Sequence, residues 1–243
     1  MKFTDLHLCV PWDNLEQAKR LVAKSAELGY NQIGVPLPHS LNAEAVDQLR
    51  QISGEVGLDF VTRLDLAPRS PDELLIGLRR FRRKFEVVSV LCNSKPVARQ
   101  AAKDRRVDLL CFRSFDPSKR FFDRAEAELA SASSAAFEID MAQVLSSFEG
   151  RSGVGLLSRL RRELATAKSS GVPLVISSGA SEPLLLRKPK DYAALTLLFE
   201  LDEPRALEAL SENPSAIVKR SRSKQSAWYV APGVRLVKTR RDG

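Results

Sequence analysis

The stretch FEVVSVLCNSKPVARQAAKDRRVDLLCF, residues 85–112, decides the fold of this chain. Its two short apolar runs, residues 86–92 and 108–112, are rich in valine, leucine and cysteine and are typical of buried strands. Residues 94–104 lie between them and read as a short helix that begins at Asn93 or Ser94. A strand, a helix and a second strand in this order predict two parallel strands joined by a helical crossover.

The same alternation of strand and helix continues toward both ends of the chain. The predicted strands cover residues 3–8, 31–37, 58–66, 86–92, 108–112, 136–140 and 173–179. The predicted helices cover residues 14–28, with Asp13 as N-cap, and 42–52, 71–84, 94–104, 153–169, 190–199 and 203–211. Seven strands with no convincing eighth predict an α/β fold, an irregular TIM-like barrel with parallel strands and outer helices. An open doubly wound sheet is the alternative, although no glycine-rich phosphate loop follows the first strand.

The length of 243 residues suits one barrel, and we expect it to cover residues 1–220. We expect residues 221–243 to be a basic tail, because from residue 213 onward eight Lys or Arg residues stand against one acid. The whole chain carries a net charge of +8, and this local excess is typical of segments attracted to nucleic acid. The tail either forms a hairpin around Pro232 and Gly233 or stays disordered until bound, and the sequence leaves both open.

The composition also indicates the cellular compartment of the protein and the oxidation state of its cysteines. No apolar run approaches the roughly 20 residues that would span a bilayer, and the start lacks the layout of a signal peptide, so we expect a cytoplasmic protein. Cys9, Cys92 and Cys111 are odd in number and far apart in the chain. We expect them to be buried free thiols rather than disulfides or metal ligands.

In barrels of this kind, functional groups lie where the strands end. The candidate positions are His7, His39, Asp65, Cys92, Arg113, Glu138, Asp140 and the turn Ser177-Ser178-Gly179. A metal site assembled from Asp5, His7, His39, Glu138 and Asp140 would be poor, because the chain has only two histidines. The alternative is that Asp5 and His7 are interior polar groups bonded to each other or to Arg63. The serine turn is a candidate phosphate-binding turn.

Basic residues near the ends of different strands suggest a rim that could contact RNA phosphates. This rim comprises Arg63, Lys95, Arg113, Lys119, Arg187 and Lys188. Two local clusters, residues 79–84 and 187–190, are further candidates, and a solvated helix face is the other interpretation of the first. Few aromatic side chains lie nearby, which favours contact with the RNA backbone over stacking on single-stranded bases.

Several segments follow one another in a specific order: FTDLHLCV at residues 3–10, LGYNQIGVP at 28–36, RLDL at 63–66, residues 85–112, FEID at 137–140, SSGA at 177–180, LRKPKDYAALTLLF at 186–199 and SENPSAIVKR at 211–220. Together these segments resemble the TIM-barrel protein subunit family of ribonuclease P, known in archaea as ribonuclease P protein component 3. The resemblance covers residues 1–220 in order. It implies a non-catalytic subunit, without a cofactor of its own, of an enzyme whose RNA removes the 5′ leader from precursor tRNA.

The resemblance also implies partners and contact residues. The implied partners are ribonuclease P RNA, precursor tRNA and a small RRM-like protein subunit, in pairs that can associate into a heterotetramer, with no membrane. The RNA-contact residues implied are Arg113, Arg187, Lys188 and Lys190. The family is related to metal-dependent PHP phosphoesterase barrels, whose first strand carries His-x-His, whereas this position reads Asp5-Leu6-His7 here. A phosphoesterase of that superfamily is the alternative function.

Overall fold

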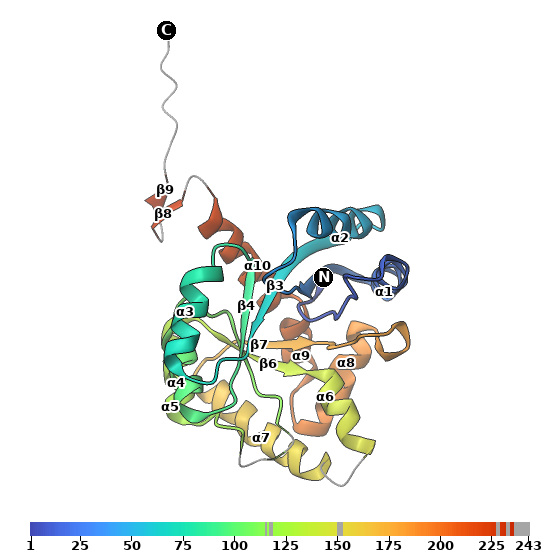
Figure 1. Cartoon of the computed structure of the whole chain (residues 1–243). Coiled ribbons are helices and arrows are strands. Elements are labelled where there is room, and N and C mark those ends of the chain that lie inside the picture. Colours follow the sequence, from blue (N-terminus) through green and yellow to red (C-terminus); the bar gives the residue numbers. More distant parts are fainter. Residues whose placement is uncertain (115, 117–118, 150–152, 227–228, 232–233, 236–243) are drawn as a thin grey trace.

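The computed structural model describes all residues except 115, 117–118, 150–152, 227–228, 232–233 and 236–243. Seven parallel strands form one sheet in sequence order (Figure 1). They are β1 (Phe3–Asp5), β2 (Tyr30–Pro36), β3 (Asp59–Leu66), β4 (Val87–Leu91), β5 (Leu109–Cys111), β6 (Ala136–Asp140) and β7 (Leu174–Ser177). The prediction of an irregular TIM-like barrel with seven parallel strands is therefore confirmed, and the open doubly wound sheet is excluded.

Helices pack around the outside of this barrel. The predicted ones are present as α1 (Leu15–Glu27), α2 (Ala43–Glu55), α3 (Pro71–Phe81), α4 (Lys95–Lys103), α7 (Gly153–Ser169), α8 (Pro189–Leu195) with the 3₁₀ turn η4 (Thr196–Phe199), and α9 (Glu203–Leu210). The N-cap of α1 is Asn14 rather than Asp13, because the Asn14 side chain accepts a hydrogen bond from the Gln17 backbone N–H. The prediction missed α5 (Arg124–Ser133), α6 (Met141–Ser146) and α10 (Glu212–Gln225).

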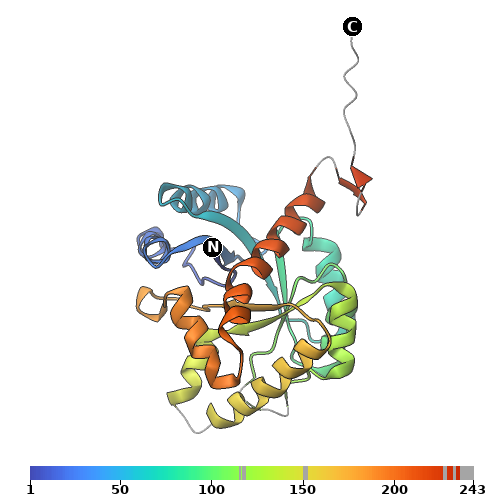
Figure 2. The same ribbon diagram turned by 180° about the vertical axis from the view of Figure 1, so that it is seen from behind.

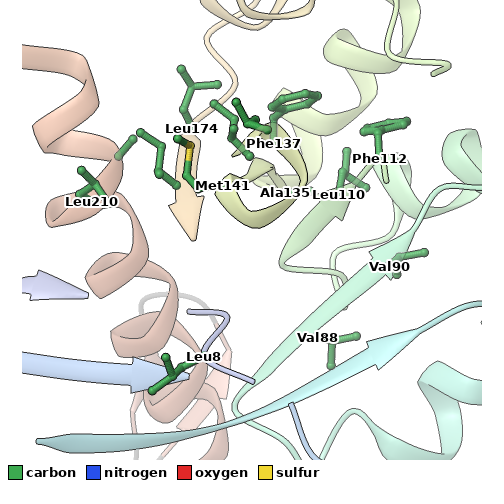
Figure 3. Close-up of a cluster of buried hydrophobic side chains, with 14 of the residues drawn as sticks. Leu8, Val88, Val90, Leu110, Phe112, Ala135, Phe137, Met141, Leu174 and Leu210 are labelled. Carbon is green, nitrogen blue, oxygen red and sulfur yellow. The ribbon is translucent and has the colours of Figure 1, made fainter. Parts of the chain in front are cut away.

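Side chains alternate between the inside and the outside of the barrel along each strand, so the apolar residues form two separate cores. On β4, Val88 and Val90 point outward into the main core beneath the helices, where α4 contributes Val97 and Ala101. Figure 3 shows part of this core, in which the rings of Phe112 and Phe137 stack with their centroids 5.7 Å apart. Inward residues from the N-terminal parts of the strands form a second cluster, made of Val61, Val87, Leu109, Ala136 and Val175 together with Leu6, which follows β1, and with Ile217 and Val218 of α10.

The barrel closes between β7 and β1, and among the described residues no eighth strand joins the seven-stranded sheet. Just beyond these strands, the backbone N–H of Gly179 donates to the carbonyl of His7, and that of Cys9 donates to the carbonyl of Ala180, both at 2.9 Å. These two bonds join the C-terminal ends of the strands, so the barrel is closed at this end. We call this end the mouth and the opposite end the floor.

Helix α10 covers the floor of the barrel (Figure 2). Ile217 and Val218 pack against the innermost apolar layer, and the Asn213 side chain donates to the Leu174 carbonyl at 2.9 Å. The helix continues to Gln225, five residues beyond the expected end of the barrel at residue 220. Ser221 is buried and Arg222 bonds to Asp59, so the contacts between α10 and the barrel extend past residue 220.

After α10, strands β8 (Tyr229–Ala231) and β9 (Val234–Arg235) pair antiparallel, which favours the hairpin over the disordered tail. The proposed turn residues Pro232 and Gly233 lie outside the described residues. Cys92 and Cys111 are buried free thiols as expected, whereas Cys9 is partly exposed. Among the described residues no helix is both long and apolar enough to cross a membrane.

Candidate functional site at the mouth of the barrel

The interior of the barrel changes from apolar to charged between floor and mouth. Alternate residues of a strand point inward, so on β3 the inward series reads Val61, Arg63, Asp65, and on β6 it reads Ala136, Glu138, Asp140. Ser89 and Ser177 occupy the middle level on β4 and β7, where both hydroxyls donate to Glu138. Ser89 is not among the candidate positions predicted from the sequence, although the period of two places it directly above the inward Val87.

Arg63 occupies the centre of this charged interior. Its side chain is fully buried, and its Nη2 lies 2.8 Å from Glu138 Oε2 while its Nε lies 2.6 Å from Asp65 Oδ1. A further bond from Nη1 reaches the Leu6 carbonyl at 2.9 Å. Burial alone would raise the pKa of Glu138, but the Arg63 charge and hydrogen bonds outweigh it and lower that pKa. Arg63 therefore balances interior acids and cannot reach RNA, so its assignment to the basic rim is corrected.

His7 lies between the two carboxylates nearest the opening. Its Nδ1 is 3.3 Å from Asp140 Oδ2, and its Nε2 is 3.4 Å from Asp65 Oδ2. Burial and the charge of Arg63 disfavour protonation, but the hydrogen bonds to Asp140 and Asp65 outweigh both and raise the pKa of His7 well above its ordinary value. His7 thus acts as a second interior cation.

Arg113 covers His7 from the solvent side. Its Nη2 lies 2.9 Å from Nε2 and 3.2 Å from Nδ1 of His7. An atom this close to both ring nitrogens lies over the face of the ring and not along either lone pair, which is compatible with a protonated imidazole. Arg113 also approaches Asp65 at 3.5 Å and Asp140 at 3.4 Å. Its side chain is 37% exposed, so it forms the outer surface of the mouth.

The serine turn after β7 faces the interior. The backbone N–H of Ser178 donates to Asp5 Oδ1 at 3.0 Å, Gly179 donates to His7, and Ala180 donates to Ser178 Oγ at 3.1 Å. A β-carbon at Gly179, whose φ is +62°, would lie 2.1 Å from Asp140 Oδ1. Because these N–H groups already have acceptors, the prediction of a phosphate-binding turn is wrong.

Asp5 and His7 are interior groups, as the second interpretation proposed. Asp5 Oδ1 accepts the backbone N–H of His7 at 3.0 Å, and burial raises the pKa of the Asp5 carboxyl. Neither bonds directly to Arg63 in the way that interpretation suggested; Arg63 pairs with Asp65 and Glu138 instead.

A metal centre does not assemble at the mouth. His39 is exposed at the surface, with its ring in edge contact with Phe81 at 4.7 Å. In the part of the chain that the structure describes, no three His, Cys, Asp or Glu side chains are grouped so that they could hold a metal ion. The carboxylates of Asp65, Glu138 and Asp140 are instead engaged by Arg63, His7 and Arg113, which supply the positive charge that a metal would supply. The phosphoesterase alternative is not favoured.

The remaining cations of the expected rim are exposed in loops or first helical turns on the mouth side. Lys95 begins α4 after β4 and lies 3.7 Å from Asp123, and Lys119 lies in the loop after β5. Arg187, Lys188 and Lys190 surround the start of α8, and Arg187 Nη1 donates to the carbonyls of Leu184 and Leu186. Arg113 contacts the charged interior directly. Their part in RNA contact stays a prediction.

Comparisons with known proteins agree with this fold. The model of the family described as RNase P subunit p30 matches residues 2–226. A ribonuclease P protein component 3 from Methanosarcina barkeri is 30% identical over 236 residues, which cover 97% of this chain and 96% of the relative. Another from Methanococcoides burtonii is 29% identical over 234 residues, covering 96% of this chain and 93% of the relative.

One solved structure shares the whole architecture. A chain in the cryo-EM structure of archaeal ribonuclease P with mature tRNA superposes with a TM-score of 0.80 and 20% sequence identity. The superposition covers 98% of this chain and 100% of that chain, so the barrel and its surrounding helices are common to both.

Proposed function

The chain belongs to the RNase P subunit p30 family, and from this membership we propose that it is a protein subunit of ribonuclease P. In this role it supports the catalytic RNA in removing the 5′ leader from precursor tRNA. The observation that carries the proposal is the match of the family model to residues 2–226, which include the barrel and all of α10.

The mouth supports a non-catalytic role for the polypeptide. Hydrolysis of a phosphodiester requires an activated nucleophile or a metal ion with an open coordination position. At the mouth, His7 lies between two carboxylates beneath Arg113, and Glu138 accepts bonds from Arg63, Ser89 and Ser177. These groups neutralise one another, and the catalytic step is assigned to the RNA.

The partners we propose are ribonuclease P RNA and precursor tRNA, together with a small RRM-like protein subunit. The cations proposed to contact RNA phosphates at the mouth are Lys95, Arg113, Arg187, Lys188 and Lys190. They carry positive charge on three separate loops, and neutralising phosphates would release the counterions condensed on RNA.

Reconstitution tests the proposal. Cognate ribonuclease P RNA is assembled with its protein subunits, with and without this chain, and leader cleavage is measured across a range of magnesium concentrations. We expect omission of this chain to lower the cleavage rate and raise the magnesium requirement. If neither quantity changes, the chain does not have the proposed role. Co-purification with the RRM-like subunit tests the partner assignment separately.

A further inference from the structure

Three segments far apart in the sequence bring cations to the floor of the barrel. Residues 79–84 end α3 and lead into β4, and residues 103–106 end α4 and lead into β5. Residues 219–224 belong to α10, which lies across the floor (Figure 2). Because the strands are parallel, all segments that lead into strands reach the same end of the barrel. Together the three segments contain twelve Lys or Arg residues and one acid, Asp104.

An inner set of these cations is paired and holds α10 in place. Arg82 Nη2 lies 3.1 Å from Asp108 Oδ2 and 3.2 Å from Ser221 Oγ, and Arg220 approaches Asp108 at 3.4 Å. Arg222 bonds to Glu86 at 2.6 Å and to Asp59 at 2.7 Å. These contacts show that α3, the start of β5 and α10 are neighbours at the floor. The acids available there are used by this inner set.

An outer set remains exposed, and we call it the floor patch. It consists of Arg83, Lys84, Lys103, Arg105, Lys219 and Lys224. Within the described residues, none of these six side chains has an acidic partner within ion-pair distance. Partial burial and the nearby charges of Arg220, Arg82 and Arg105 lower the pKa of Lys224, against the opposing charge of Asp108. The floor therefore carries excess positive charge that an external anion could neutralise.

The chemistry of the floor patch favours RNA over an acidic protein. The large exposed apolar side chains among the described residues, such as Ile76, Phe148 and Leu184, lie outside the three segments. Protein interfaces normally contain apolar or aromatic anchors at their centre and are depleted of lysine there. A surface of Lys and Arg without such anchors instead matches the closely spaced phosphates of a nucleic acid.

We infer that the floor patch is a second RNA-binding surface, at the opposite end of the barrel from the cations of the mouth. A second RNA-binding surface goes beyond the proposed function, because RNA would then contact both ends of the same protein. RNA segments at the two ends would be held apart by the length of the barrel.

Salt-dependent binding tests the inference. The full chain and the variant R83Q/R105Q/K224Q are titrated with ribonuclease P RNA from the same organism between about 0.05 and 0.4 M KCl. We expect the variant to bind at least about tenfold more weakly near 0.15 M salt, with a slope of log affinity against log salt shallower by about two or more. The matched control R20Q/R124Q/R162Q removes three exposed arginines from the outer helices α1, α5 and α7 and should change the slope by less than about one.

The outcomes separate this inference from the proposed function. A slope for R83Q/R105Q/K224Q equal to that of the matched control overturns the inference, even if reconstituted cleavage depends on the chain. If R83Q/R105Q/K224Q keeps the salt slope of the wild-type chain but reconstituted cleavage is lost, the floor patch contacts a protein. That result also overturns the inference. If the slope falls as expected but omission of the chain leaves cleavage unchanged, the inference stands and the proposed function fails. Thermal melting of both variants checks that each is folded.

Discussion

Arg63 and Glu138 form the central charge balance of the barrel. Both side chains are completely buried, and Glu138 accepts additional hydrogen bonds from Ser89 and Ser177. Charges taken out of water lose their hydration, and the loss is offset only when each has a close and well-bonded partner. The pair therefore depends on both members: without Arg63 the Glu138 carboxylate loses its cation, and without Glu138 the Arg63 guanidinium keeps only Asp65 as an acidic partner.

We predict that Glu138→Ala lowers the free energy of unfolding by about 3–5 kcal/mol, because it leaves the Arg63 charge buried without its main partner. Urea unfolding measures the change. Glu128→Ala is the matched control, because Glu128 pairs with Arg124 at the surface and its loss should cost less than about 1 kcal/mol. A loss for Glu138→Ala no larger than for the control would contradict the assigned role of Arg63.

His7 gives stability a dependence on pH above neutrality. Its pKa in the folded state is raised by Asp140 and Asp65, so its stabilising contribution is complete below the unfolded pKa of about 6.5. The contribution is lost as the pH rises through the higher pKa of the folded state. We predict that the stability advantage of the wild type over His7→Gln is largest near pH 6 and shrinks steadily toward pH 9. Denaturant unfolding across this range measures it, and a difference independent of pH would exclude a protonated His7.

At the scale of elements, α10 closes the floor of the barrel, where it contacts β1, β4 and β7. Its apolar residues Ile217 and Val218 complete the innermost layer of the floor, and its arginines pair with acids that precede or begin strands. Part of the C-terminal positive charge is therefore structural. The sequence pattern suggested a nucleic-acid-seeking tail because these arginines lack acidic neighbours in the sequence, whereas Asp59, Glu86 and Asp108 approach them only in the folded chain.

We predict that a chain ending at residue 220 is less stable than a chain ending at residue 226 by about 1–3 kcal/mol. The shorter chain lacks buried Ser221 and the bonds of Arg222 to Asp59, Glu86 and the Phe60 carbonyl. Equilibrium unfolding of the two truncated chains tests this.

Point substitutions in the longer chain identify the cause. Arg222→Ala should reproduce most of the loss, whereas Lys219→Ala, an exposed residue on the same helix, should change stability by less than about 0.5 kcal/mol. Equal stability of the two truncated chains would place the end of the barrel unit at residue 220 after all.

At the scale of the whole molecule, exposed cations lie at both ends of a barrel whose interior cations are paired with acids. Arg63 and His7 balance acids inside the mouth, and Arg82, Arg220 and Arg222 do so at the floor. Among the described residues, the cations without an acidic partner, such as those of the floor patch, are exposed and remain available to a polyanion.

We predict that Arg187→Ala with Lys188→Ala weakens binding of ribonuclease P RNA by about 1–3 kcal/mol and makes the salt dependence shallower by about one to two phosphate contacts. Filter binding at several salt concentrations measures both quantities. Arg20→Ala with Arg162→Ala removes the same charge from the outer helices and serves as control. An unchanged slope would remove Arg187 and Lys188 from the RNA-binding surface.

The sequence by itself determined the seven strands and most of the helices, because apolar alternation and helix caps are local properties of the chain. It also determined the family, through segments that keep their order over residues 1–220, and the family model matches residues 2–226. Helices α5 and α6 were not predicted, because short helices between well-defined strands have weak sequence signals of their own.

Only the tertiary structure decided which charges face solvent. Arg63 and Arg113 both lie on or just after strands and look equivalent in sequence, yet Arg63 is buried against Glu138 while Arg113 covers the mouth. Likewise the backbone N–H groups after β7 looked available for phosphate in the sequence. In the structure they bond to Asp5 and His7, where the barrel closes between β7 and β1. The physical reason is that the cost of burying a charge or an N–H group depends on partners that are distant in sequence, and those partners come together only when the barrel closes.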